Sequence, residues 1–175
     1  PNTTPTRRAP AAGYEGHALA RPAPAVEKIR ARMLDLAEEQ LAASSGQRLV
    51  LSDIAARMGM SQSNTHRFFR TKADLVRALA ERWFETVEAR VTQAVEAAGS
   101  PEAALRACIL TTLRVKRAKH DADPVLFRAY LALAAEHRDI VQRHTAQLTA
   151  ILRGILAEMV PPARLETAVA LMEAA

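Results

Sequence analysis

The chain has 175 residues, of which 49% are hydrophobic and only 4% aromatic, and its mean hydropathy is close to zero. This composition allows an ordinary globular core, and it excludes a membrane-spanning helix because no uninterrupted apolar stretch reaches the roughly 18 residues that a bilayer requires. The net charge is +5, and the whole excess lies in residues 1–72, which hold 11 Lys and Arg against 6 Asp and Glu.

The first segment, residues 1–24, is rich in Pro, Ala and Thr and shows no periodicity, which predicts a flexible arm. It lacks the apolar run after Arg7 and Arg8 that a secretory signal needs. The single cysteine, Cys108, cannot form an internal disulfide and fits a reducing compartment. We therefore expect a cytoplasmic protein.

Ala, Leu, Arg and Glu dominate the rest of the chain and favour helix over strand, because these side chains lose little rotamer freedom on a helix. Apolar residues at helical spacing predict a first helix over residues 26–41. A short helix is expected from the N-cap Ser52 to Met58, and another from the N-cap Ser61 to about Phe69.

The remaining elements are also predicted to be helices. Thr71 is expected to cap a long helix, in which apolar residues recur every four positions from Leu75 to Val95. Further helices are predicted from Pro101 to about His120, from Pro124 with Asp123 as its cap, from about Arg138, and after the Pro161-Pro162 interruption. The sequence therefore predicts an all-α fold.

The segment of residues 51–75, LSDIAARMGMSQSNTHRFFRTKADL, has the features of a helix-turn-helix. Ile54, Ala55 and Met58 supply the inner face of its first helix, and Met60 helps to close the core. Gly59 stands where the turn needs a left-handed residue, which glycine provides without a Cβ penalty. Plain packing of two short amphipathic helices would use the same pattern.

The outward face of the second short helix is polar and has no acidic residue, which suits contacts with base edges and phosphates. Its members are Gln62, Ser63, Asn64, His66 and Arg67. The concentration of positive charge in residues 1–72 points to the same polyanionic partner. We therefore predict recognition of double-stranded DNA; contact of a basic head with an acidic protein is the alternative.

This arrangement resembles the tetracycline-repressor (TetR) family of transcriptional regulators, in which the helix-turn-helix is followed by a phenylalanine, a Ser/Thr-Lys step and a long connecting helix. Phe69, Thr71 and Lys72 stand at those positions here. The resemblance covers about residues 29–79, and beyond them only the chain length and the helical pattern agree. It implies a three-helix DNA-binding head over residues 25–72 and a helical ligand-binding and dimerisation domain over residues 73–175.

The resemblance also implies roles for individual residues. Gln62, Ser63 and Asn64 correspond to the base-reading set, which Arg67 can join, and the phosphate anchors correspond to Ser52, Thr71 and Lys72. The chain departs from the family at Thr65-His66, where a Leu-Tyr pair is usual, and at Phe68, where a histidine is usual. The family's tyrosine commonly contacts a phosphate, so either His66 takes that role or the contact is lost.

For the second domain the resemblance implies a homodimer on an inverted-repeat operator. It further implies release from DNA by an unidentified small molecule and, more often than activation, repression. Small ligands generally sit between the helices of a bundle. The residues predicted to line such a site are Ile109, Thr112, Leu113, Phe127, Tyr130 and Leu131.

Two other classes of function compete with a DNA-binding regulator. An enzyme is not expected, because the chain has no glycine-rich phosphate loop, serine elbow or supported Cys/His pair, and no cofactor is implied. A metal-sensing regulator is a further alternative. Its candidate ligands are His120, Asp121 and Asp123 at a helix boundary and His137 and His144, seven residues apart.

Overall fold

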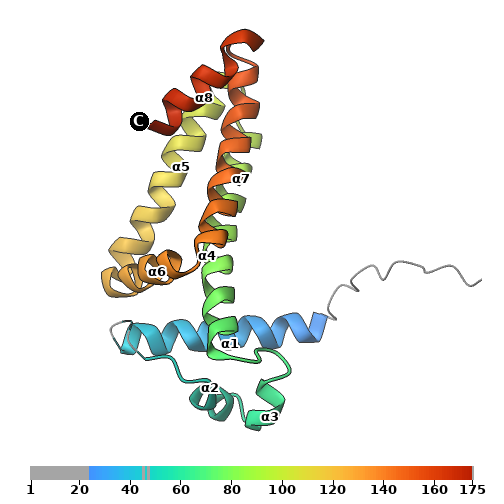
Figure 1. The fold of residues 1–175 in the computed structure, drawn as a ribbon, viewed down its shortest axis with the longest axis vertical. Coiled ribbons are helices and arrows are strands. Elements are labelled where there is room, and N and C mark those ends of the chain that lie inside the picture. Colours follow the sequence, from blue (N-terminus) through green and yellow to red (C-terminus); the bar gives the residue numbers. More distant parts are fainter. Residues whose placement is uncertain (1–23, 45, 47, 175) are drawn as a thin grey trace, which may run out of the picture.

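The computed structural model describes residues 24–44, 46 and 48–174. The arm was predicted over residues 1–24; residues 1–23 lie outside the described part, and Pro24 is instead the first residue of a helix. The described residues form helices and no strand, which confirms the all-α prediction (Figure 1). The α-helices are α1 (Pro24–Ala43), α2 (Leu51–Arg57), α3 (Gln62–Thr65), α4 (Lys72–Glu96), α5 (Pro101–Ala122), α6 (Pro124–Glu136), α7 (Arg138–Ala157) and α8 (Leu165–Ala174), with a 3-10 helix at Pro162–Arg164 before α8. In the described part of the chain no helix is both long and apolar enough to cross a membrane.

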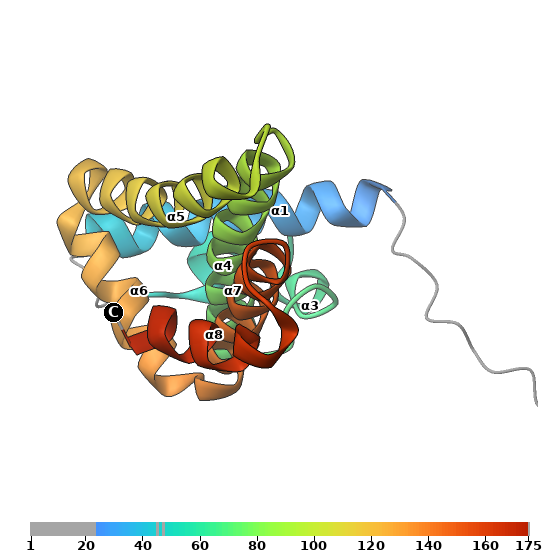
Figure 2. The same cartoon turned by 90° about the horizontal axis from the view of Figure 1, so that it is seen from above.

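The helices form a head and a body that α4 joins. In Figure 1, α1 lies across the lower part of the molecule with α2 and α3 beneath it, and α4 rises from the head into the body beside α5 and α7. The view from above shows α4 and α7 nearly end-on, with α6 lying over one end of α1 (Figure 2). Because α4 contacts α1 in the head and α5, α6 and α7 in the body, a movement of this helix changes the packing of both.

Most helix boundaries agree with the predicted caps. Thr71 and Asp74 form a capping box, in which the Thr71 side chain accepts from the Asp74 amide at 3.1 Å and the Asp74 carboxylate accepts from the Thr71 amide at 2.9 Å. The Ser61 and Asp123 side chains also accept amide hydrogen bonds at the starts of α3 and α6.

Two boundaries were predicted wrongly. Ser52 is not the N-cap of the second helix: α2 begins at Leu51, after an extended Val50. The side chain of Gln40, on α1, bonds both the amide of Val50 (2.9 Å) and its carbonyl (3.4 Å), so a tertiary contact determines where α2 begins. The third helix ends at Thr65 instead of Phe69, and the chain continues in tighter turns.

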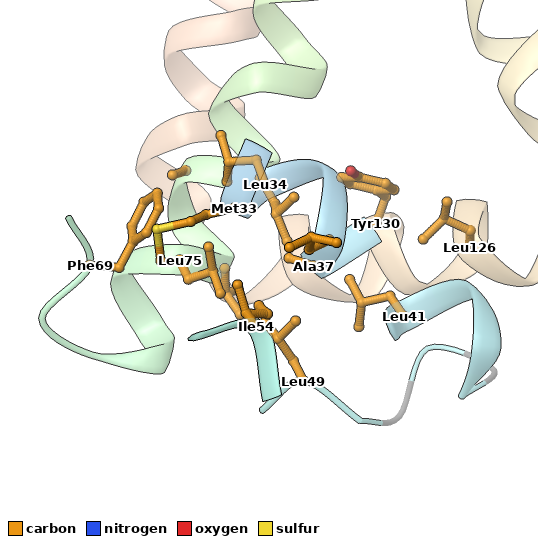
Figure 3. Packing of buried hydrophobic residues seen from close by; sticks show 14 residues of the cluster. Met33, Leu34, Ala37, Leu41, Leu49, Ile54, Phe69, Leu75, Leu126 and Tyr130 are labelled. Atoms are coloured by element: carbon orange, nitrogen blue, oxygen red, sulfur yellow. The ribbon is translucent and has the colours of Figure 1, made fainter. Parts of the chain in front are cut away.

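The hydrophobic core of the head includes residues from both predicted domains. Met33, Leu36 and Ile54 of α1 and α2 pack with Leu75 and Leu79 of α4, and all five are at most 2% exposed. Two α6 residues belong to the same cluster, Leu126 and Tyr130, and Figure 3 shows their side chains beside Ala37 and Leu41 of α1. The head therefore shares part of its core with the body.

A second cluster fills the body between α4, α5 and α7. Val87 and Val91 of α4 meet Cys108 of α5 and Ile155 of α7, and Trp83 packs against this cluster as well as that of the head. Cys108 is buried, as its place in an apolar stripe indicates, and burial raises the pKa of its thiol. Its thiol therefore contributes as a small apolar group.

A polar cluster, here called the Glu38 junction, ties the head to the body and comprises Glu38, Arg82, Lys119 and Tyr130. The Glu38 carboxylate on α1 accepts a hydrogen bond from the hydroxyl of Tyr130 on α6. It also pairs with Arg82 of α4 at 3.1 Å and with Lys119 of α5 at 3.7 Å. Burial and the neighbouring Glu38 raise the pKa of Tyr130, so its hydroxyl stays protonated and able to donate.

Two glycines of the head have positive φ, and they provide a matched test of the head–body contact. Gly46 has φ +81° and Gly59 has φ +65°, so an alanine at either position costs about 1 kcal/mol of backbone strain. A Cβ at Gly46 would lie 2.7 Å from the Cβ of Ala129 on α6, whereas one at Gly59 meets open space.

We expect Gly46→Ala to lower the free energy of unfolding by at least about 1 kcal/mol more than Gly59→Ala, because the former also forces α6 away from the head. Urea denaturation of the two variants measures the difference. Equal losses would mean that α6 does not press on the head in solution.

Candidate nucleic-acid interface

The turn between α2 and α3 has the geometry that its sequence predicts. Gly59 adopts the left-handed conformation with φ +65°, and the amide of Met60 donates to the carbonyl of Ala55 at 2.9 Å. Ile54 and Ala55 are buried on the inner side of α2. The turn therefore holds α3 at a defined angle to α2, as a helix-turn-helix requires.

Ser61 and Thr65 hold the short α3 in place. The Ser61 hydroxyl accepts from the amide of Asn64 at 3.2 Å. The Thr65 side chain is fully buried, and its hydroxyl donates to the carbonyl of Ser61 at 3.1 Å. Thr65 thus occupies a core position, where a threonine satisfies its buried hydroxyl through the local backbone.

The predicted base-reading residues lie together on the outer side of α3 and the turn after it. Gln62, Ser63, His66 and Arg67 are exposed and Asn64 is half-buried. The His66 ring donates from Nδ1 to the carbonyl of Arg70 at 2.9 Å, because a carbonyl oxygen only accepts. This bond orients the ring and leaves Nε2 available for an external partner.

The predicted phosphate anchors lie at the starts of α2 and α4. Ser52 is exposed in the first turn of α2, and Lys72 is the exposed first residue of α4. The backbone amide of Thr71 is bonded to Asp74, so it is not available to an anion. Among the described residues, three cations at this surface form no ion pair: Arg67, Arg70 and Lys72. Their charge is therefore not neutralised within the head.

Arg30, on α1, positions this surface and was not among the predicted residues. Its guanidinium donates to the carbonyl of Phe68 at 2.7 Å and lies 4.4 Å from the centre of the Phe69 ring. Phe69 itself is only 2% exposed. Because the partners are 38 residues apart in the chain, no local pattern in the sequence points to this contact.

The structure brings together three of the six residues predicted to line a ligand site. Ile109, Thr112 and Leu113 line one cleft between α5, α7 and α8. Tyr130 lies in the head core, and Leu131 lines a different groove between α6 and α7. The ring of Phe127 packs edge-on against His120, with their centres 5.6 Å apart.

The candidate metal ligands are dispersed. Within the described ranges no group of three or more His, Cys, Asp and Glu is arranged to hold a metal ion. His120 bonds Asp121 at an exposed site, whereas His144 is buried and bonds Glu88 of α4 at 2.7 Å. These histidines therefore have separate protein partners.

Comparisons with known proteins agree with this architecture. Residues 101–161 match the family model for the tetracyclin repressor-like C-terminal domain. Over 102 residues, or 58% of this chain, the sequence is 33% identical to the HTH-type transcriptional repressor LfrR of Mycolicibacterium smegmatis. The chain is therefore similar to TetR-type regulators over these parts. The aligned part spans about half of that relative, 47% of its length.

A solved structure is similar in fold to most of this chain. SCO7518 of Streptomyces coelicolor A3(2), a candidate transcriptional regulator, superposes with a TM-score of 0.59 over 84% of both chains, at 21% sequence identity. The matched domain model begins at residue 101, beyond the residues 29–79 that carry the resemblance seen in the sequence. The resemblance of the head and the family match of the body therefore rest on separate parts of the chain. The curated relative named here is a transcriptional repressor.

Proposed function

We propose that this protein is a TetR-type transcriptional repressor that binds an inverted-repeat operator as a homodimer in the cytoplasm and leaves DNA when a small molecule binds its body. The observation that carries the proposal is the exposed surface of α3, where polar side chains without an acidic member lie next to Arg67, Arg70 and Lys72, whose charges are unpaired among the described residues. Such a surface is complementary to a DNA groove and the phosphates beside it.

In this proposal, contacts with base edges and contacts with phosphates have different effects. Gln62 and Asn64 can pair bidentately with adenine and Arg67 with guanine, and these pairs select the sequence. Ser52, Thr71, Lys72 and the outer nitrogen of His66 contact phosphates and set the register of the head on the duplex. An inverted repeat requires two heads related by a two-fold axis, for which the exposed parts of α7 and α8 are the proposed contact.

Ligand control follows in this proposal from the shared core. α4 begins at the head, where Lys72 is its first residue, and continues into the body beside the cleft-forming helices α5 and α7. A ligand that changes the packing of the body therefore tilts α4 and alters the spacing of the two heads. A dimer holds only one spacing in register with successive turns of the DNA groove, so affinity for the operator falls.

The first experiment selects random duplex DNA on the purified protein at two salt concentrations and sequences the retained pool. We expect an inverted repeat and binding that weakens steeply as the salt concentration rises, because phosphate contacts release counterions. Recovery of no sequence motif would overturn the operator-binding proposal.

Substitutions then separate sequence reading from phosphate contact. Arg67→Ala is expected to weaken operator binding about tenfold or more and to relax the preference at one base pair. Lys72→Ala should weaken binding to all sequences alike and reduce the salt dependence by about one counterion. Arg117→Ala is the matched control, since Arg117 is 84% exposed on α5, outside the head. Fluorescence anisotropy measures all three, and an equal effect of Arg117→Ala would contradict the assigned surface.

A further inference from the structure

The cleft between α5, α7 and α8 has a volume of about 750 Å³. Its apolar lining includes Ile109 and Leu113, which are 39% and 59% exposed, together with Leu148 and Leu152 of α7 and Met172 of α8. A hollow of this size with an apolar lining fits a drug-sized molecule.

One histidine bordering this cleft has an unused hydrogen-bonding atom. His144 is 4% exposed, and its ring stacks on Phe84 with the ring centres 4.3 Å apart. Nδ1 donates to the Glu88 carboxylate at 2.7 Å, since a carboxylate only accepts. Nε2 is buried and has no partner among the described residues. A buried polar atom without a partner costs free energy, so this position calls for an explanation.

The state of the ring determines what Nε2 can bind. Burial lowers the pKa of His144 more than Glu88 raises it, which favours the neutral imidazole. With its proton on Nδ1, the neutral ring offers Nε2 as an acceptor. Two nearby hydroxyls of the lining already donate elsewhere, from Thr112 to the Cys108 carbonyl at 2.8 Å and from Thr149 to Glu173. They too offer only lone pairs to a ligand.

We propose that this cleft binds a small, largely apolar molecule carrying a hydroxyl or N–H group, and that this group donates its hydrogen bond to Nε2 of His144. The inference deepens the ligand control proposed above and rests on it for its regulatory meaning. Since solvent does not reach Nε2 in this structure, a side chain of the lining must move aside as the ligand enters. The His144–Glu88 bond then connects the ligand directly to α4.

A matched pair of probes tests the hydrogen bond. 2-Naphthol has a hydroxyl donor, and 2-methoxynaphthalene has the same ring system without one. Equilibrium dialysis with the full chain should show that naphthol binds about tenfold more tightly than the ether, the usual worth of one hydrogen bond. In His144→Phe, which keeps an aromatic ring against Phe84, the two probes should bind equally. His120→Phe, at an exposed histidine outside the cleft, should keep the tenfold preference.

Several outcomes would overturn the inference. These are binding of neither probe, equal binding of both to the unaltered chain, and a preference that survives in His144→Phe. Leu113→Arg is a second variant at an exposed position, where folding does not depend on the side chain, and it should abolish binding of both probes by blocking the cleft. If Leu113→Arg instead dissociates a dimer in light scattering while the unaltered chain binds no probe, the cleft is a protein interface and the inference fails.

The dialysis contains no DNA, so the two proposals fail separately. A chain that selects no operator but discriminates the probes through His144 refutes the proposed function and leaves the ligand chemistry standing. A chain that selects an operator but shows no discrimination refutes only the inference.

Discussion

Leu79→Ala is expected to lower the free energy of unfolding by about 2–5 kcal/mol, the usual cost of a large cavity in a packed core. Leu79 is 0% exposed on α4 and belongs to the cluster that α1, α2, α4 and α6 share. Truncation removes contacts in the head and at its junction with the body together. We therefore expect urea denaturation to remain a single transition with a lower midpoint.

Leu131→Ala is the matched control for this substitution. Leu131 lies on α6, outside the proposed dimer contact, and is 56% exposed, so the same chemical change should alter the free energy of unfolding by about 0.5 kcal/mol or less. If Leu79→Ala cost no more than Leu131→Ala, the packing described for the head would not exist in solution.

Glu38→Ala should lower the free energy of unfolding by about 2 kcal/mol, because it removes the common acceptor of the Glu38 junction. The Tyr130 side chain is 3% exposed, and its hydroxyl loses the partner it has in the structure. Arg82 and Lys119 lose the carboxylate that lies between them. For a chain of this size the melting temperature should fall by roughly 4–8 °C, at about 2–4 °C per kcal/mol.

Glu39→Ala tests whether this loss is specific to the junction. Glu39 is the next residue of α1, but its side chain is 48% exposed and pairs with Arg32 and Arg57 at the surface. Such surface pairs contribute about 1 kcal/mol or less. Calorimetry of both variants gives the comparison, and equal melting temperatures would show that the Glu38 junction does not hold head and body together.

Local features of the sequence account for most of the fold. The Thr71 cap needs only the side chains and amides of neighbouring residues, and Asp123 likewise bonds amides two and three positions away. The left-handed turn at Gly59 depends on the absence of a Cβ. Helical periodicity also places the polar face of α3 outward, and the exposure of Gln62 and Arg67 agrees with this pattern. Interactions between residues this close in the chain can be predicted from a single sequence.

The features that the sequence could not settle depend on residues far apart in the chain. Gln40 sets the start of α2, and Arg30 bonds the carbonyl of Phe68 across 38 positions. Tyr130, predicted to line a ligand site, lies instead in the shared core, because α6 packs against α1.

The candidate ligand site also combines features that the sequence predicts with features that depend on residues far apart in the chain. Ile109, Thr112 and Leu113 are three of the residues predicted to line a ligand site, and the structure places all three in one cleft. His144 was considered only as a candidate metal ligand, since its sequence neighbours do not reveal that Glu88 occupies Nδ1 and leaves Nε2 unpaired. Periodicity shows which face of a helix is apolar, whereas the tertiary structure determines which helices meet and which polar atoms they leave without a partner.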